Sequence, residues 1–88
     1  MTISARLDLH GMTQDDAFEA LSAFIPAAWT AGKRCVLVIT GKGKGVLKAR
    51  VPQWLAAPGL AGVILRTAPA RPQHGGDGAL YVLLRRRR

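Results

Sequence analysis

Apolar and polar residues alternate at the start of the chain. Between residues 3 and 10 the apolar members are Ile3, Ala5, Leu7 and Leu9, and the polar members are Ser4, Arg6, Asp8 and His10. A period of two is typical of a strand with one buried face, because successive side chains of a strand point to opposite sides. The pattern therefore predicts a first strand over residues 3–10.

A helical period follows between residues 13 and 32. Thr13 supplies an N-cap hydroxyl, Asp16 stands in the position of a capping box, and Gly32 closes the segment. The apolar positions of this stripe are Ala17, Phe18, Leu21, Phe24, Ile25, Ala28 and Trp29. Pro26 removes a backbone hydrogen bond inside this segment, so we expect a kink or a break near Ile25.

A continuous apolar run over residues 34–40 is typical of a central strand that is buried on both faces. After the glycine-rich residues 41–45, a second helical stripe consists of Leu47, Val51, Trp54 and Leu55. Pro52 falls in or near the first turns of this helix, and Pro58 with Gly59 ends it.

Two further strands are predicted over residues 62–66 and 79–84, joined by a polar loop rich in proline and glycine. The order is therefore β-α-β-α-β-β, an α/β (α+β) arrangement. Each β-α-β crossover makes its two strands parallel, and the last connection has no helix, so the fourth strand should run antiparallel in a mixed four-stranded sheet. With this topology the loops that contain Gly11, residues 41–45 and residues 74–78 meet at one edge of the sheet, where ligands bind in open sheets of this kind.

Composition limits the chain to one small domain. It has 88 residues, of which 49% are hydrophobic, and no apolar run approaches the roughly 18 residues that cross a bilayer. We expect a single domain over residues 1–84 and a basic tail over residues 85–88. The single Cys35 and the absence of a signal-peptide pattern favour a cytoplasmic protein, and we expect a monomer.

The net charge of +8 favours a polyanion as partner, and nucleic acid is the first candidate. Arg85 and Arg86 belong to the terminal run of four arginines that supplies half of this charge, and we count both among the candidate nucleic-acid contacts. A solvated, frayed tail is the alternative interpretation of that run. Without these four arginines the net charge is still +4, from nine basic and five acidic residues.

Asp8 and His10 are the candidate catalytic pair. Two residues apart on a strand, they point the same way with Cα atoms roughly 6.6 Å apart. Imidazole exchanges a proton near neutral pH, and a neighbouring carboxylate orients the ring and holds its tautomer. The alternative is a structural histidine at a polar strand end.

The loops after the second and third strands contain the candidate phosphate contacts. The first group follows a strand and opens a helix, where backbone N–H groups receive phosphates, and consists of Thr40, Gly41, Lys42, Gly43, Lys44 and Gly45. The second group, His74, Gly75, Gly76 and Gly78, predicts a tight turn with positive φ angles or a close approach to a ligand. A flexible turn and an exposed loop histidine are the respective alternatives. Trp29, Trp54 and Tyr81 are predicted core residues, although Tyr81 could present its hydroxyl at the sheet surface.

Four motifs in this order, "LDLHG", "VLVITGKGKG", "VPQWL" and "HGGDGALYVLLRR", resemble the Smr (small MutS-related) domain over residues 6–86. The resemblance implies a two-layer α/β sandwich similar to the C-terminal domain of a bacterial translation initiation factor. It also implies binding of DNA or RNA, endonuclease activity, and roles in DNA repair and recombination or in mRNA cleavage at stalled ribosomes. The D-x-H motif of the family falls on Asp8 and His10, its T-G-x-G motif on residues 40–43, and its H-G-G-x-G motif on residues 74–78.

The resulting hypothesis is an endonuclease in which His10 is a general acid or base and Asp8 orients it or holds a metal ion. RNA cleavage can use the neighbouring 2′-hydroxyl as nucleophile without a metal, whereas DNA cleavage needs an activated water and therefore favours Mg²⁺. The first alternative is an adaptor that binds nucleic acid without cleaving it. A small protein-interaction module is the second alternative.

Overall fold

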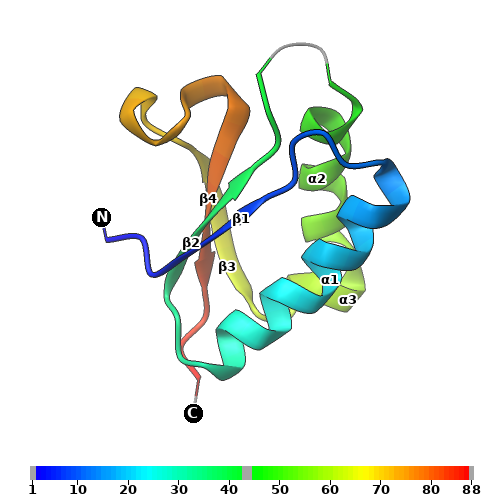
Figure 1. Cartoon of the computed structure of the whole chain (residues 1–88). Helices are drawn as coiled ribbons and strands as arrows, with labels where there is room; N and C mark the ends of the chain where they lie inside the picture. The colour runs from blue at the N-terminus through cyan, green and yellow to red at the C-terminus, as the bar shows by residue number, and fades with distance from the viewer. Residues whose placement is uncertain (1, 43–44, 88) are drawn as a thin grey trace.

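The structure is a computed structural model that describes residues 2–42 and 45–87. Its elements in chain order are β1 (Ala5–Asp8), α1 (Gln14–Thr30), β2 (Cys35–Ile39), α2 (Val46–Ala56), α3 (Pro58–Ala61), β3 (Ile64–Pro69), two 3₁₀ turns (Pro72–His74 and Gly76–Gly78) and β4 (Ala79–Leu84) (Figure 1). In this part of the chain, no helix is long and apolar enough to span a membrane.

The four strands form one mixed sheet in the order β1-β2-β4-β3. β1 pairs with β2 in parallel, and β4 pairs antiparallel with both β2 and β3. The helices lie together on one face of this sheet (Figure 1). The predicted mixed four-stranded sheet with an antiparallel last strand is therefore confirmed.

β2 is buried on both faces, which explains its unbroken apolar sequence. Val36 and Val38 pack into the main core between the sheet and the helices. Cys35 and Leu37 point the other way and pack with Tyr81 of β4 in a second, smaller cluster. Burial raises the pKa of the Cys35 thiol, so this cysteine stays protonated as a small hydrophobic side chain.

β1 is an edge strand with one buried face, as its alternation predicts. Leu7 packs against the main core and Leu9 is fully buried, whereas Arg6, Asp8 and His10 are exposed. The strand itself is shorter than predicted, because its parallel pairing with β2 covers Ala5–Asp8 alone.

α1 continues through Pro26 to Thr30, so the predicted break near Ile25 is wrong. Pro26 is exposed, so its ring lies on the solvent side of the helix, away from the packed face. The buried stripe of Leu21, Ile25 and Ala28 holds both halves of the helix against the sheet.

α2 also contains a proline in its interior, since it begins at Val46 and Pro52 is its seventh residue. Pro52, predicted in or near the first turns, lies in the second turn, beyond the first helical position where a proline costs no hydrogen bond. Its exposed position again explains how the helix tolerates it. α2 ends at Ala56, and Pro58 begins the short α3 rather than a loop. The predicted stripe is confirmed, with Leu47, Val51 and Leu55 buried.

β3 covers Ile64–Pro69, later along the chain than the predicted residues 62–66. Pairing with β4 sets its position, with a register irregularity between Ile64 and Arg66. The tail beyond β4 stays attached to the domain, because the Arg85 backbone N–H donates to the Val63 carbonyl at 2.8 Å. An Arg87 guanidinium nitrogen donates to the Thr30 carbonyl at the end of α1 at 2.9 Å, so residues 85–87 are docked rather than frayed.

Candidate functional site

The predicted convergence of three loops at one sheet edge is confirmed by hydrogen bonds between them. The Gly78 carbonyl accepts the backbone N–H of Thr40 at 2.7 Å and that of Gly41 at 3.0 Å. It also accepts the buried Thr40 hydroxyl at 3.3 Å. The two glycine-rich loops, from strands far apart in the sequence, are therefore fastened to each other at the end of β2.

Gly78 has no side chain because the other loop occupies the space. A Cβ on Gly78 would lie 2.9 Å from both the Gly41 carbonyl carbon and the Lys42 backbone nitrogen. Gly41, at a φ of +94°, lies so close to β1 that its own Cβ would be 3.3 Å from the Cβ of His10. The contact chain Gly78, Gly41, His10 thus links the three loops.

Asp8 and His10 form the pair that the sequence predicts. The Asp8 Oδ1 accepts the backbone N–H of His10 at 3.0 Å and lies 3.1 Å from the imidazole Nδ1. The backbone hydrogen bond from His10 is the main reason that the pKa of Asp8 is lowered; burial opposes it, and the imidazole contact adds to the lowering. Asp8 is therefore a carboxylate at neutral pH and fixes the proton of His10 on Nδ1.

The remaining ring nitrogen of His10 is available to a ligand. A carboxylate can only accept, so the Nδ1–H donates to Asp8, and in the neutral imidazole Nε2 carries the lone pair. The His10 side chain is 69% exposed and that of Asp8 is 54% exposed. This is the arrangement of a general base that is oriented by a carboxylate and open to solvent.

Gly11 follows this pair at a φ of +83°, which favours glycine. A Cβ on Gly11 would meet nothing within 4 Å, so the backbone angle, not a need to keep the site clear of a side chain, explains this glycine. The turn closes with the Met12 N–H donating to the Leu9 carbonyl at 3.0 Å and leads into α1.

A groove with a volume of about 520 Å³ opens beside His10. One wall is the β1–α1 turn and the other is the β2–α2 loop with the start of α2. Its lining residues are His10, Gly11, Met12, Thr13, Gln14, Thr40, Gly41, Lys42, Gly45, Val46 and Leu47. Met12, Gln14 and Val46 are site residues that the sequence analysis missed; their positions at the two helix starts, which the topology brings together, were the available signal.

The N-termini of the two helices both reach this groove but differ in charge. α1 carries Asp15 and Asp16 in its first turn, and Thr13 Oγ1 accepts the Asp16 N–H at 3.2 Å, so its positive end is already compensated. α2 begins after Gly45 without a side-chain cap and has no acidic residue in its first turn. The start of α2 is therefore the better place for an anion.

The glycine N–H groups predicted to receive phosphate mostly donate within the protein. Besides Gly41, the N–H groups of Gly75, Gly76 and Gly78 donate to the carbonyls of Pro72, Arg71 and Gly75. The predicted positive φ angles are confirmed at Gly75 and Gly76, with values of +113° and +51°. These glycines shape the loops, while Lys42 and the start of α2 face the groove; Gly43 and Lys44 lie outside the described residues.

His74 is held by Tyr81, whose ring is almost fully buried. The His74 Nδ1 and the Tyr81 hydroxyl are 2.6 Å apart, and the rings meet edge to face with centroids 5.7 Å apart. The same hydroxyl accepts the Arg71 backbone N–H at 3.1 Å. Tyr81 is thus a core residue whose hydroxyl fixes the β3–β4 loop, a role that the sequence left open.

The β3–β4 loop has a second anchor, an ion pair between Asp77 and Lys48 of α2 at 3.6 Å. Over residues 2–42 and 45–87, no three His, Cys, Asp or Glu side chains gather closely enough to hold a metal ion. Asp8 remains the candidate carboxylate for Mg²⁺, with one of its oxygens already bonded to His10.

Arg85 and Arg86 do not join this site. β4 begins beside Ile39 at the site edge and runs away from it, so the two arginines follow its far end. Figure 1 shows the C-terminus at the opposite end of the sheet from the three loops.

The comparisons with known proteins agree on one family. The family model described as "Smr domain" matches residues 7–85. The chain is 42% identical over 79 residues to the ribosome rescue factor SmrB of Tolumonas auensis and 44% identical over 79 residues to that of Vibrio cholerae. These matches cover 89% of this chain but 43% and 40% of the relatives, so the chain spans less than half of their length.

Two solved structures show the same fold. The Smr domain of Thermus thermophilus MutS2 superposes with a TM-score of 0.81 at 27% identity, covering 92% of this chain and 98% of that one. YdaL, a stand-alone small MutS-related protein from Escherichia coli, superposes with a TM-score of 0.84 at 31% identity, covering 92% of this chain and 64% of that one. The α+β fold, the match over residues 7–85 and these similarities show that the chain belongs to the Smr domain family.

Proposed function

We propose that this Smr domain binds RNA in the groove beside His10 and cleaves its phosphodiester backbone. The observation that carries the proposal is the His10 ring, which is exposed, fixed through Nδ1 by the Asp8 carboxylate at 3.1 Å, and placed on the wall of a groove that also contains Lys42.

In the proposed reaction, Nε2 of His10 accepts the proton of a ribose 2′-hydroxyl. The 2′-oxygen attacks the adjacent phosphorus, and the bond from phosphorus to the 5′-oxygen breaks. The leaving oxygen takes a proton from water, and the His10 imidazolium returns its proton to the resulting hydroxide. The products are a 2′,3′-cyclic phosphate and a 5′-hydroxyl. Asp8 stabilises the imidazolium that forms, because its carboxylate accepts the Nδ1–H throughout.

The phosphate is held on the α2 side of the groove. Lys42 supplies a positive charge there, and the uncapped start of α2 offers N–H groups and the positive end of its dipole. Asp15 and Asp16 on the α1 side repel the backbone and so favour one position for it across the groove.

The donor set favours RNA over DNA. Mg²⁺ takes oxygen ligands in an octahedral arrangement and is usually held by one or two carboxylates together with substrate phosphates. Asp8 is the one carboxylate next to His10, and its Oδ1 is committed to the His10 backbone and ring. A 2′-hydroxyl supplies the nucleophile without a metal-activated water, so RNA fits these residues better.

The names of the relatives suggest where this cleavage takes place. Curated relatives carry the printed name "ribosome rescue factor", and we propose that this chain, too, acts on RNA associated with ribosomes, in the cytoplasm. Roles in DNA repair and recombination, and nicking of DNA with Mg²⁺, have less support from this donor set.

Cleavage of labelled single-stranded RNA and DNA, with and without EDTA, tests the proposal. We expect RNA to be cut in EDTA, and Asp8→Ala and His10→Ala to lose the activity while keeping RNA binding. Full activity in both variants would refute the site. Salt-sensitive binding without any cleavage would establish the adaptor function, and no affinity for either polynucleotide would leave the protein-interaction module.

A further inference from the structure

A second group of basic side chains lies at the edge of the sheet opposite the groove. It consists of Lys33, Arg34, Arg85 and Arg86, which we call the basic edge. Lys33 and Arg34 precede β2, and Arg85 and Arg86 follow β4, its antiparallel neighbour. The Leu84 N–H donates to the Arg34 carbonyl at 2.8 Å, so the two pairs of residues are adjacent although about 50 positions apart in sequence.

The basic edge is ordered by contacts that leave its charges accessible. The Arg85 backbone N–H donates to Val63, and Arg34 Nε lies 3.4 Å from the Leu84 carbonyl. The Arg87 guanidinium donates to Thr30 and so ties the tail to the end of α1. Arg34, Arg85 and Arg86 are nevertheless exposed, so docking of the tail fixes its backbone and presents their side chains to solvent.

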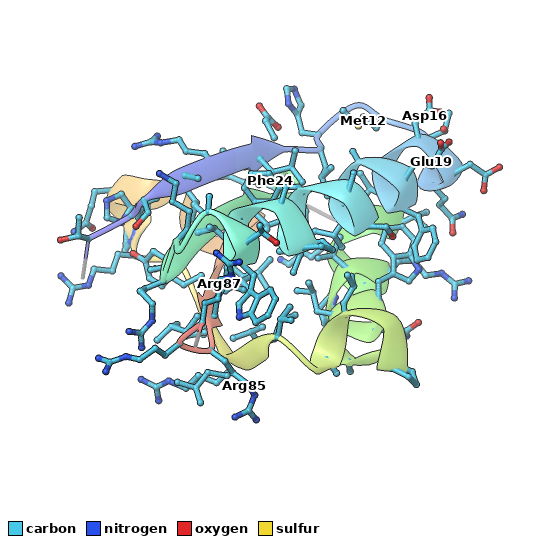
Figure 2. The ribbon with its side chains drawn as sticks, turned by 90° about the horizontal axis from the view of Figure 1, so that it is seen from below. Met12, Asp16, Glu19, Phe24, Arg85 and Arg87 are labelled. Atoms are coloured by element: carbon cyan, nitrogen blue, oxygen red, sulfur yellow. The ribbon has the colours of Figure 1, made fainter. Side chains whose placement is uncertain are left out.

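No acidic side chain balances this group. In the described parts of the chain, the ion pairs are those of Asp8 with His10 and of Asp77 with Lys48, both at the groove edge. The other acidic residues lie near the start of α1. Figure 2 shows Arg87 by the C-terminal half of α1 and Arg85 by the segment between α3 and β3, both away from Asp16 and Glu19 at the N-terminal end of α1.

From this arrangement we infer that the basic edge is a second binding surface for the nucleic-acid backbone, separate from the groove. The inference rests on the proposed function for the nature of the ligand, but not on cleavage. Exposed arginines in a chain of net charge +8 bind phosphates by releasing condensed counterions. Arginine also presents a planar fork of donors that matches phosphate oxygens.

The fold sets the distance between the two surfaces. β4 runs from Ala79 at the groove edge to Leu84 at the basic edge, and its six residues span roughly 20 Å at about 3.4 Å each. A stacked strand rises about 3.4 Å per nucleotide, so about six nucleotides separate a phosphate in the groove from one at the basic edge. A dinucleotide can therefore occupy the groove alone, whereas a strand of twelve nucleotides reaches both surfaces.

The test compares two proteins that both carry His10→Ala, which keeps the RNA intact. The parent protein has no other change, and the double variant also carries Arg85→Ala and Arg86→Ala. Binding of a labelled dinucleotide and of a labelled 12-nucleotide single strand is measured across a salt series with the full 88-residue chain. For the long strand we expect about a tenfold loss of affinity and a salt slope smaller by about 1.4, which is two phosphate contacts at about 0.7 each. Affinity for the dinucleotide should not change.

Arg50→Glu is the matched control, because it changes the net charge by the same amount at an exposed position of α2. It should weaken binding of the long strand much less than the double variant does.

The second surface would be overturned by equal losses of affinity in the control and the double variant, by equal losses for short and long RNA, or by no loss at all. If the parent protein binds neither RNA, the proposed function fails as well; if it binds both RNAs and the double variant binds like it, the second surface alone fails. Thermal unfolding of the variants excludes misfolding, since alanine at residue 85 retains the backbone hydrogen bond to Val63.

Discussion

His10 and His74 lie at the same edge of the sheet, and their surroundings are opposite. The His10 ring is hydrogen-bonded through Nδ1 to the exposed Asp8 carboxylate, and its side chain is 69% exposed. The His74 ring is half-buried, and its Nδ1 is 2.6 Å from a hydroxyl that belongs to the almost fully buried Tyr81. An imidazole that is oriented through Nδ1 and exposed to solvent suits proton transfer. An imidazole that is hydrogen-bonded to a core residue anchors a loop instead.

This difference predicts the largest effect that a single substitution should have. His10→Ala should lower the rate of RNA cleavage by about 10² to 10⁴, the usual contribution of a general acid or base. Its free energy of unfolding should change by no more than about 0.5 kcal/mol, because the side chain is exposed. His74→Ala is the matched variant and should lower the rate far less. Equal losses of rate in the two variants, measured with the same labelled RNA, would abolish the distinction.

Gly78→Ala tests whether the loop of His74 positions the loop beside His10. The added methyl group would lie 2.9 Å from backbone atoms of Gly41 and Lys42, so the two loops must move apart. We expect a loss of about 1 to 3 kcal/mol in the free energy of unfolding, measured in urea, together with slower cleavage.

Gly59→Ala is the control for this substitution, because a Cβ there meets nothing within 4 Å and Gly59 does not have a positive φ. Its stability should equal that of wild type or exceed it slightly. A Gly78→Ala protein that is as stable and as active as the control would show that the close approach of the loops does not matter.

Tyr81→Phe tests whether the hydrogen bond between Tyr81 and His74 stabilises the β3–β4 loop. It removes the hydroxyl that pairs with His74 and accepts the Arg71 N–H, so we expect a loss of about 1 to 2 kcal/mol in unfolding free energy. His74→Ala should cost about 1 kcal/mol, and the two losses should not add in the double variant, because they remove the same hydrogen bond. Strict additivity in chemical denaturation would contradict the pairing.

The smallest expected effect concerns the titration of Asp8. The backbone N–H of residue 10 is the main cause of its lowered pKa, and alanine at position 10 keeps that N–H. A carbon-detected NMR titration should therefore find the Asp8 pKa below its ordinary value in wild type and only partly restored in His10→Ala. Since the pKa is lowered on folding, the small stabilisation from this carboxylate is present above the unfolded-state pKa and is lost as pH falls through the folded-state value. A pKa that returns fully to normal in His10→Ala would assign the shift to the ring instead.

The sequence predicted the arrangement of the site better than its inner contacts. The strand directions that follow from two β-α-β crossovers and a final antiparallel strand were enough to bring three loops together, and the two-residue spacing was enough to pair Asp8 with His10. The continuous apolar run was enough to predict that β2 is buried on both faces, and its side chains do pack into two clusters on opposite sides of the sheet.

Contacts between loops could not be predicted, because they depend on tertiary distances. Gly78 looked like a phosphate-binding glycine, but its carbonyl accepts Thr40 and Gly41 and its missing side chain makes room for the neighbouring loop. The break expected at Pro26 failed for a similar reason: burial of Ile25 and Ala28 holds the helix together across the proline. The difference between the two helix starts was visible in Asp15 and Asp16 and could have been used.

The proposed cleavage depends most on the 2′-hydroxyl as nucleophile and on His10 as the group that takes its proton. The direct test is cleavage, in EDTA, of one RNA strand and of the same strand with a single 2′-deoxynucleotide on the 5′ side of the mapped cut. We predict that the RNA is cut at that bond to give a 2′,3′-cyclic phosphate and a 5′-hydroxyl, and that the deoxy-substituted bond stays intact. Cleavage of the deoxy-substituted bond, or cleavage that appears only when Mg²⁺ is added, would contradict the account.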